Sequence, residues 1–386
     1  MVAMIAIACG VAYVGLLALK LLGTCIALRQ ERRHVHAALN MQYTQDVAIV
    51  QPILGGDPLL KMVLSDNLIA LPKAHFFWLL DENDATGRGV TDALVAQYPQ
   101  HHIHCRLYGE APDGVNPKTF KLAAVLPDID KCIFVVLDDD VRLSLGALAQ
   151  LVSDLDRADL VTALPCYLDD GSFGARLIAQ FVNNNAALTY LPLLPFLPPL
   201  TINGMCYALR THRLRSLGGF APLLHQLTDD LAMARTLRAQ NAKLFQSSAC
   251  VLVQTHIPSL TLYREQMHRW FFFATLLLRS ERPVMQAMIG MFHGVPPLLL
   301  WILFACAMVQ PVGLAGGLTV LVILIRAASL CALQFRLTGR LRHHLVFSLL
   351  AELLQPLHLA HALLVRRIRW RTRLYKISAN DEFHAV

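Results

Sequence analysis

Charged residues are scarce in this chain. Of its 386 residues, 16% are charged and 55% are hydrophobic, whereas soluble domains are about one quarter charged. The shortage of charge argues against an ordinary water-soluble protein. Together with the positive mean hydropathy, it predicts that a substantial part of the chain does not face water.

Paired cysteines and phosphate-binding loops are absent from the sequence. The nine cysteines occur singly and no CxxC pair is present. We therefore predict neither a disulfide framework nor a zinc site, which suits a reducing cytosol. Gly55 and Gly56 lack the GxxxxGK spacing of a nucleoside-triphosphate loop, and we interpret them as a turn.

The basic residues do not follow the pattern of a nucleic-acid-binding surface. The net charge of +7 comes from 34 basic and 27 acidic residues. The basic residues flank apolar runs instead of alternating with exposed aromatic residues. We predict no nucleic acid partner, and we expect the positive charge to lie near anionic lipid headgroups.

A long apolar run stands at the N-terminus. Residues 1–28 contain one charge, Lys20, and are followed by Arg29, Arg32 and Arg33. The run is long enough to cross a bilayer core of about 30 Å, and no clear signal-peptide cleavage site follows it. We interpret it as a transmembrane anchor. The positive-inside rule places the chain after it in the cytoplasm.

A second apolar region, residues 286–366, contains three candidate spans. They cover residues 287–309, 312–333 and 345–365. Three spans after a cytoplasmic domain would send the basic tail, residues 367–386, to the outside, against the positive-inside rule. The third span contains Glu352 and Pro356, so it is a candidate for a re-entrant or interfacial segment. The alternative is that the rule is overridden here.

The central region, residues 46–280, alternates short apolar runs with amphipathic stretches. This pattern is typical of an α/β domain with a mostly parallel sheet. We predict strands at 47–54 and 76–80, followed by turns that contain Asp57 and Asp81. Open α/β sheets bind their ligands at the carboxyl ends of strands, so these turns are candidate ligand sites.

The strongest local pattern is a run of carboxylates after an apolar strand. Residues 132–137 are continuously apolar and lead directly into Asp138, Asp139 and Asp140. Adjacent carboxylates repel one another unless a positive charge compensates them, and a divalent cation is the natural partner. The alternative is a solvated cap of the helix predicted over 144–155.

The segment 186–200 is apolar but contains four prolines, at positions 192, 195, 198 and 199. Proline excludes a regular helix, and an irregular backbone is not tolerated in contact with lipid tails. We expect this segment to lie on the membrane surface or to line a groove. A buried loop in the protein core is the alternative.

Several short motifs, taken in order, resemble the ceramide glucosyltransferase family, a branch of the GT-A glycosyltransferases with bacterial relatives that act on other lipids. Each motif alone is weak, but their order and their separations are specific. The matching segments are Gly114 to Lys118, Asp138 to Arg142, Asn203 to Met205, Thr228 to Asp230, Gln266 to Trp270 and Trp370 to Tyr375. Two positions depart from the family pattern: Asp139 replaces a small or neutral residue, and Asn203 replaces a threonine.

The resemblance implies a fold and a set of site residues. The fold would be a GT-A domain, which is Rossmann-like with a mostly parallel sheet, carrying N-terminal and C-terminal transmembrane helices. Asp57, Asp81 and Lys118 would contact a UDP-sugar donor, and Asp138 and Asp140 would hold Mg²⁺ or Mn²⁺ against its diphosphate.

The remaining motifs imply roles on the acceptor side. Asp230 would be the catalytic base, Arg269 would stabilise the departing diphosphate, and Gln266 and Trp270 would belong to the same catalytic motif, with Trp270 in the acceptor groove. The alternative for the stretch that begins at Trp270 is an interfacial helix without a catalytic role.

Together these features predict an inverting hexosyltransferase that acts on a lipid hydroxyl. It would be a multi-pass protein of the bacterial inner membrane with a cytoplasmic catalytic domain. Two alternatives are a processive polysaccharide synthase, which normally has more spans, and a non-catalytic membrane scaffold with a degenerate transferase domain. Neither the sugar nor the lipid can be inferred from the sequence, because specificity depends on the shape of the pocket.

Overall fold

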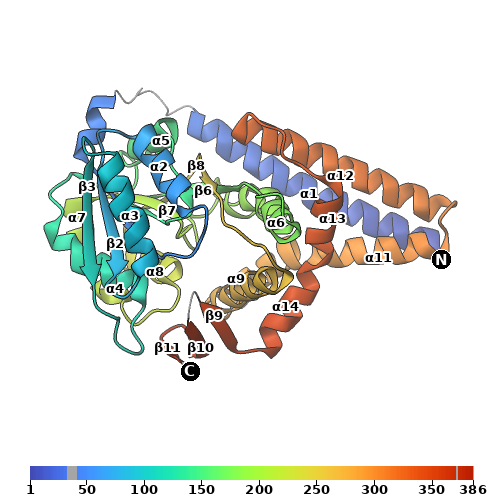
Figure 1. Cartoon of the computed structure of the whole chain (residues 1–386). Coiled ribbons are helices and arrows are strands. Elements are labelled where there is room, and N and C mark those ends of the chain that lie inside the picture. Colours follow the sequence, from blue (N-terminus) through green and yellow to red (C-terminus); the bar gives the residue numbers. More distant parts are fainter. Residues whose placement is uncertain (33–40, 371–372, 386) are drawn as a thin grey trace.

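The computed structural model describes residues 1–32, 41–370 and 373–385. An α/β domain and a bundle of long helices stand at opposite ends of the molecule, and shorter helices lie between them (Figure 1). Arg33 of the basic cluster and residues 371–372 of the tail motif lie outside the described residues.

The α/β domain is built on one eight-stranded sheet in the order β3-β2-β1-β4-β7-β6-β8-β5. Its strands are β1 (Val47–Pro52), β2 (His75–Asp81), β3 (His102–Tyr108), β4 (Ile133–Leu137), β5 (Val141–Arg142), β6 (Leu160–Tyr167), β7 (Cys206–Arg210) and β8 (Leu244–Val253). The half that contains β1 to β4 is parallel, and β7 runs antiparallel to both β4 and β6. The structure confirms the predicted mixed α/β fold with a mostly parallel sheet.

Helices cover both faces of this sheet. They are α2 (Leu60–Ala70), α3 (Ala85–Gln97), α4 (Pro117–Val125), α5 (Leu145–Asp154), α7 (Thr211–Ser216) and α8 (Asp229–Ala239), with short 3₁₀ turns at Met41–Asp46, Leu126–Asp128 and Ala221–Leu223. Neighbouring residues of β1 belong to different cores, since Ile49 packs into one hydrophobic cluster and Val50 into another. A strand buried on both faces has a continuous apolar sequence, as β1 and β4 have.

Three long helical segments form the bundle. They are α1 (Val2–Arg32), the pair α10 (Pro283–Ile289) and α11 (Val295–Val309) joined by a π turn at Gly290–Gly294, and α12 (Leu314–Thr338). Helix α1 packs against both α11 and α12. Four segments of the described chain are long and apolar enough to cross a membrane: Val2–Glu31, Pro283–Val309, Leu314–Thr338 and Leu345–Leu364.

The fourth of these segments is broken and lies against the middle of α1 and α12, since Tyr13 of α1 donates to Glu352 of this segment at 2.9 Å. It consists of α13 (Leu345–Leu353) and α14 (Gln355–Leu364), and both run across the direction of α1, α11 and α12 (Figure 1). Pro356 stands in the first turn of α14, where a proline is tolerated at a helix start. The Arg326 guanidinium lies 2.6 Å from the Glu352 carboxylate and ties α12 to α13.

Both ends of the α13–α14 segment lie beside helices that stand between the α/β domain and the bundle. We call these helices the middle layer. At its start, the His344 amide donates to Gln180 Oε1 of α6 (Phe173–Tyr190) at 3.1 Å. Just after its end, the Arg367 carbonyl is 3.1 Å from a ring nitrogen of His268 in α9 (Leu260–Ser280). The chain therefore enters and leaves this segment on the side of the α/β domain.

The tail forms a small antiparallel sheet of β9 (Arg367–Trp370), β10 (Arg373–Ala379) and β11 (Glu382–Ala385). It docks on the loop that precedes α8, where the Leu227 amide donates to the Asn380 carbonyl at 2.8 Å. The basic tail is thus folded against the α/β domain.

The proline-rich segment differs in part from the prediction. Helix α6 continues to Tyr190, so the expectation that 186–200 contains no regular helix is wrong for its first five residues, because the first proline comes only at position 192. The rest is irregular. It packs closely on α1, since a Cβ added at Gly23 would lie 2.4 Å from the Pro192 carbonyl oxygen. Phe196 is 70% exposed.

Candidate active site

The candidate site lies where strands β1, β2 and β4 end. Strand β1 pairs in parallel with both β2 and β4, so their carboxyl ends share one edge of the sheet. Asp57 follows β1, Asp81 ends β2, and Asp138 and Asp140 follow β4. The turns predicted from the sequence therefore meet at this edge.

Lys118 is the central cation of the site. Asn116 caps α4 by accepting hydrogen bonds from the amides of Lys118 and Thr119. Lys118 Nζ then lies 2.8 Å from Asp138 Oδ1 and 3.2 Å from Asp229 Oδ2. It also donates to the Gly204 carbonyl at 2.9 Å. The Lys118 ammonium group thus joins three other sequence motifs, those that contain Asp138, Gly204 and Asp229.

Burial and charge act in opposite directions on this cluster. Burial alone would lower the pKa of Lys118, but the carboxylates of Asp138 and Asp229 raise that pKa above its ordinary value. Burial raises the pKa of Asp138, and Lys118 opposes the increase. An ionised Asp138 therefore depends on positive charge supplied close by.

The three adjacent carboxylates have different partners. Asp139 Oδ2 accepts from the Leu54 amide at 2.8 Å and so supports the loop after β1. Asp140 Oδ2 accepts from the Thr255 hydroxyl at 2.6 Å. The helix-cap alternative is wrong, because α5 is capped by Ser144, whose hydroxyl accepts from the Ala147 amide.

The carboxylates suit a divalent cation that the substrate helps to coordinate. No group of three or more His, Cys, Asp or Glu side chains that could hold a metal occurs in the described part of the chain. Mg²⁺ usually takes only one or two carboxylates and completes its shell with water and substrate phosphates. Asp138, whose side chain is 25% exposed beside Lys118, and Asp140 fit that donor set.

Asp230 is a partly buried carboxylate beside the cluster. It stands in the first turn of α8, and its Oδ1 accepts from the Leu231 amide at 2.7 Å. Burial, followed by the charge of Asp229, raises the pKa of Asp230 to about 7. Gly204 allows this packing, since a Cβ there would be 3.2 Å from Asp230 Cβ.

Helix α9 carries the motif Gln266 to Trp270 to the site. Arg269 donates to Gln266 Oε1 at 2.8 Å, one turn away. The Trp270 ring stacks on Phe181 of α6 with centroids 6.2 Å apart and meets Tyr167 edge-on at 5.8 Å. Trp270 therefore packs in the layer between the α/β domain and the helix bundle.

Sequence reasoning missed Tyr167, which connects these groups. It is the last residue of β6 and is buried. Burial and then the charge of Asp140 raise its pKa, while Arg269 opposes the increase. Tyr167 thus feels both the carboxylates after β4 and the α9 motif. Only its position at the end of an apolar strand could have indicated it.

Two of the predicted donor contacts, Asp57 and Asp81, have partners that the sequence did not indicate. Asp81 Oδ1 lies 3.0 Å from Lys121 Nζ, a lysine that is 2% exposed. Asp57 Oδ2 accepts from the His256 amide at 3.1 Å. The His256 ring in turn lies 2.5 Å from Asp170. Asp57 and Asp81 therefore stand beside the Lys118 cluster with partners of their own.

Comparisons with solved structures identify a related fold. A mannosyltransferase from Pyrobaculum calidifontis, in complex with GDP-Man and Mn²⁺, is similar with a TM-score of 0.51 and 15% identity, covering 94% of this chain and 98% of that one. A mycobacterial protein matches with a TM-score of 0.36 and 15% identity, covering 61% of this chain and 79% of that one. No curated protein sequence matches the chain.

The likeness to the mannosyltransferase shows the fold, and the similar region takes in nearly the whole length of both chains. The family is shown by a match at the sequence level. The model of glycosyl transferase family 21 matches residues 2–383, which takes in every motif described above. The chain belongs to glycosyl transferase family 21, the ceramide glucosyltransferase-like family, and is a glycosyltransferase.

Proposed function

We propose that the protein transfers a hexose from a UDP-sugar to a lipid hydroxyl, with inversion at the anomeric carbon. The observation that carries this proposal is the partly buried Asp230 carboxylate, with its raised pKa, beside the Lys118, Asp138 and Asp229 cluster. The cluster sits at the sheet edge that faces α9 and the membrane-type helices. One site thus meets a soluble donor on one side and a lipid on the other.

The arrangement of helices supports a lipid acceptor. Helices α6, α9, α13 and α14 lie between the α/β domain and the bundle of α1, α11 and α12 (Figure 1). If the bundle crosses the membrane, α6 and α9 lie in the headgroup region. Segment 345–365 is then re-entrant, because its Glu352 accepts a hydrogen bond from Tyr13 in the middle of α1, and the basic tail stays on the side of the catalytic domain, as the positive-inside rule requires. We assign this side to the cytoplasm of a bacterial inner membrane.

The donor would bind along the carboxyl ends of β1, β2 and β4. Asp57 and Asp81 would hold its uridine end, with Lys118 beside the diphosphate. A Mg²⁺ or Mn²⁺ ion held by Asp138 and Asp140 would supply positive charge to the diphosphate oxygens. The Arg269 guanidinium suits the same oxygens because its planar fork matches their geometry.

Asp230 would take the proton of the acceptor. The lipid hydroxyl oxygen attacks the anomeric carbon, its proton passes to the Asp230 carboxylate, and the bond from that carbon to the diphosphate breaks. UDP leaves with the electron pair. A pKa of about 7 is close to the optimum for a general base at neutral pH. Gln266 would orient Arg269, and Trp270 would line the acceptor groove.

The test is a transfer assay on the purified full chain in nanodiscs made with bacterial lipid extract. Radiolabelled UDP-glucose, UDP-galactose, UDP-glucuronate, UDP-N-acetylglucosamine and GDP-mannose are supplied separately, and label is counted in the organic phase. We expect one UDP-sugar to label a single lipid. Label from GDP-mannose alone would overturn the donor assignment, and label only in water-soluble polymer would favour a polysaccharide synthase.

A further inference from the structure

A polar cavity lies at the inner ends of two long helices, and of the sequence motifs only Asp138 to Arg142 reaches it, through Arg142. It has a volume of about 700 Å³ and is lined by the end of α1, the end of α12, parts of α2, α5 and β8, and the loop after α12. Leu28 and Glu31 come from α1, and Arg336 and Thr338 from α12. If α1 and α12 cross the membrane, as in the proposed function, the cavity is at headgroup level.

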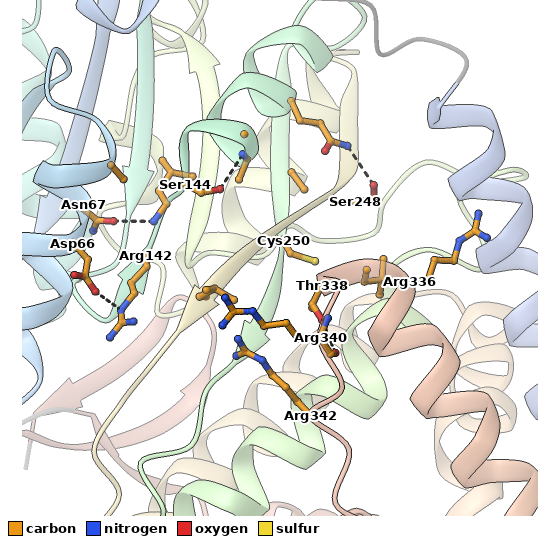
Figure 2. A pocket seen from close by; sticks show the side chains of 18 of the residues that line it. Asp66, Asn67, Arg142, Ser144, Ser248, Cys250, Arg336, Thr338, Arg340 and Arg342 are labelled. Atoms are coloured by element: carbon orange, nitrogen blue, oxygen red, sulfur yellow. Dashed lines mark hydrogen bonds and ion pairs between the residues drawn. The ribbon is translucent and has the colours of Figure 1, made fainter. Parts of the chain in front are cut away.

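Arginines dominate the charge of this cavity. Its lining contains Arg142, Arg336, Arg340 and Arg342 and only two carboxylates, Glu31 and Asp66. Figure 2 shows the guanidinium groups of Arg142, Arg340 and Arg342 turned toward a common space, whereas Arg336 points toward α1. A cluster of like charges is unfavourable unless an anion shares the space.

Both carboxylates of the lining already have partners. Asp66 Oδ2 is 3.1 Å from Arg142 Nε. Glu31 Oε1 accepts from Gln150 Nε2 at 2.7 Å and from the Ser248 amide at 2.8 Å. In the described part of the chain, neither carboxylate forms an ion pair with Arg340 or Arg342.

Arg342 shows the missing partner most directly. Its Nη1 atom is buried and has no hydrogen-bond partner in the described part of the chain. Burial, followed by the charge of Arg340, lowers the pKa of Arg342. Cys166 and Asp169, which do not line the cavity, oppose this decrease, and Arg142 adds to it. A buried guanidinium nitrogen without an acceptor costs free energy unless an anion binds to it.

We propose that this cavity, which we call the arginine cavity, binds the phosphate of an anionic phospholipid headgroup at the ends of α1 and α12. Guanidinium forks match phosphate oxygens, and headgroups of this type occur at that depth. The volume is within the usual range for small-ligand sites. The inference rests on the proposed membrane orientation but not on the proposed sugar transfer.

Binding can be measured by calorimetry on the purified full chain in a neutral detergent. The probes are dioctanoyl phosphatidylglycerol, dioctanoyl phosphatidylcholine and sodium phosphate. The test variant is Arg340→Gln with Arg342→Gln, since neither residue belongs to the candidate active site. The matched control is Arg279→Gln with Arg282→Gln, which removes the same charge from exposed positions outside the arginine cavity.

We expect phosphatidylglycerol to bind the wild type and the control equally, and to bind the test variant about tenfold or more weakly, because two charge-assisted contacts are lost. Equal affinity for the test variant would overturn the proposal. Equal affinity of the wild type for phosphatidylcholine, or for phosphate alone, would overturn the assignment to an anionic lipid headgroup. A thermal unfolding profile of each variant separates loss of binding from misfolding. Retained sugar transfer with no lipid binding would refute this inference alone.

Discussion

Asp230 differs from Asp138 and Asp229 because, among the residues that the structure describes, it forms no ion pair with a lysine or arginine, and Lys118 opposes the rise of its pKa only in part. Asp138 and Asp229 share the Lys118 ammonium group, whereas the Asp230 carboxylate accepts a hydrogen bond from the Leu231 amide. Burial therefore raises its pKa into the range where a carboxyl group exchanges protons at neutral pH. This makes Asp230 the residue whose substitution tests the chemistry.

Asp230→Asn keeps a side-chain acceptor for the Leu231 amide but cannot accept a proton from the acceptor hydroxyl. We expect kcat to fall by about a hundredfold or more with little change in donor affinity. In the wild type, a base with a pKa of about 7 is lost as the pH falls, so the rate should decrease below neutrality and level off above it. Steady-state kinetics across pH checks both. A near-normal kcat would mean that Asp230 only caps α8.

The carboxylates after β4 predict a requirement for metal. Excess EDTA should abolish transfer, and Mg²⁺ or Mn²⁺ should restore it to the wild type. Asp140→Ala should remain inactive at every cation concentration, because the cation loses one of its two protein ligands. The control is Asp139→Asn, which retains an acceptor for the Leu54 amide and should keep metal-dependent activity. Full activity in EDTA would refute this account.

Among the secondary-structure elements, the small sheet of β9, β10 and β11 supports the loop that precedes α8. Asn380 Oδ1 accepts from the Thr228 amide at 2.9 Å and from the Thr228 hydroxyl at 2.6 Å. Its amide group donates to Gln226 at 2.8 Å. Thr228 immediately precedes Asp229 and Asp230, so the turn between β10 and β11 holds the start of α8.

Asn380→Ala removes these hydrogen bonds and leaves the Thr228 groups without partners. We expect a loss of about 1–3 kcal/mol in local stability and a lower kcat with an unchanged donor KM. Asn380→Asp, which keeps the acceptor for Thr228, should recover most of the activity. Asp381→Ala, at an exposed neighbouring position, is the control. Equal kinetics for Asn380→Ala and Asp381→Ala would show that the tail does not position Asp230.

Local patterns predicted the elements well where burial is uniform. Strands β1, β2 and β4 begin and end within two residues of the predicted limits, because a strand buried on both faces has an uninterrupted apolar sequence. The extension of α6 to Tyr190 was missed, since the prolines that follow it outweighed its helical pattern. Tyr167, Lys121 and His256 were missed too, because their roles depend on contacts between distant segments.

At the scale of the whole molecule, the broken α13–α14 segment decides the topology. Its hydropathy suits a span, yet both its ends lie beside the middle layer. The sequence alone left this question open, because length and composition are the same for a crossing and an interfacial helix. The tertiary contacts favour a re-entrant segment, because both ends stay on one side while Glu352 contacts Tyr13 and Arg326 in the middle of α1 and α12.

Cysteine accessibility tests this topology. In a variant without the nine native cysteines, single cysteines are placed at Val312, Asp130 and Asp381, which are all exposed. A membrane-impermeant maleimide applied to intact spheroplasts should label position 312 only, because it lies in the loop between α11 and α12. Positions 130 and 381 should react only after permeabilisation. Labelling of 381 together with 312 would show that α13–α14 crosses the membrane.

The proposed reaction is a single displacement by a lipid hydroxyl at the sheet edge that holds Lys118, Asp138 and Asp230. Proton NMR of the glycolipid made by the purified enzyme from an α-linked UDP-sugar tests this mechanism, because one displacement inverts the anomeric carbon. We predict a β-linked sugar, recognised by the large coupling between its first two ring protons when the sugar has the gluco or galacto configuration. An α-linked product would contradict the account.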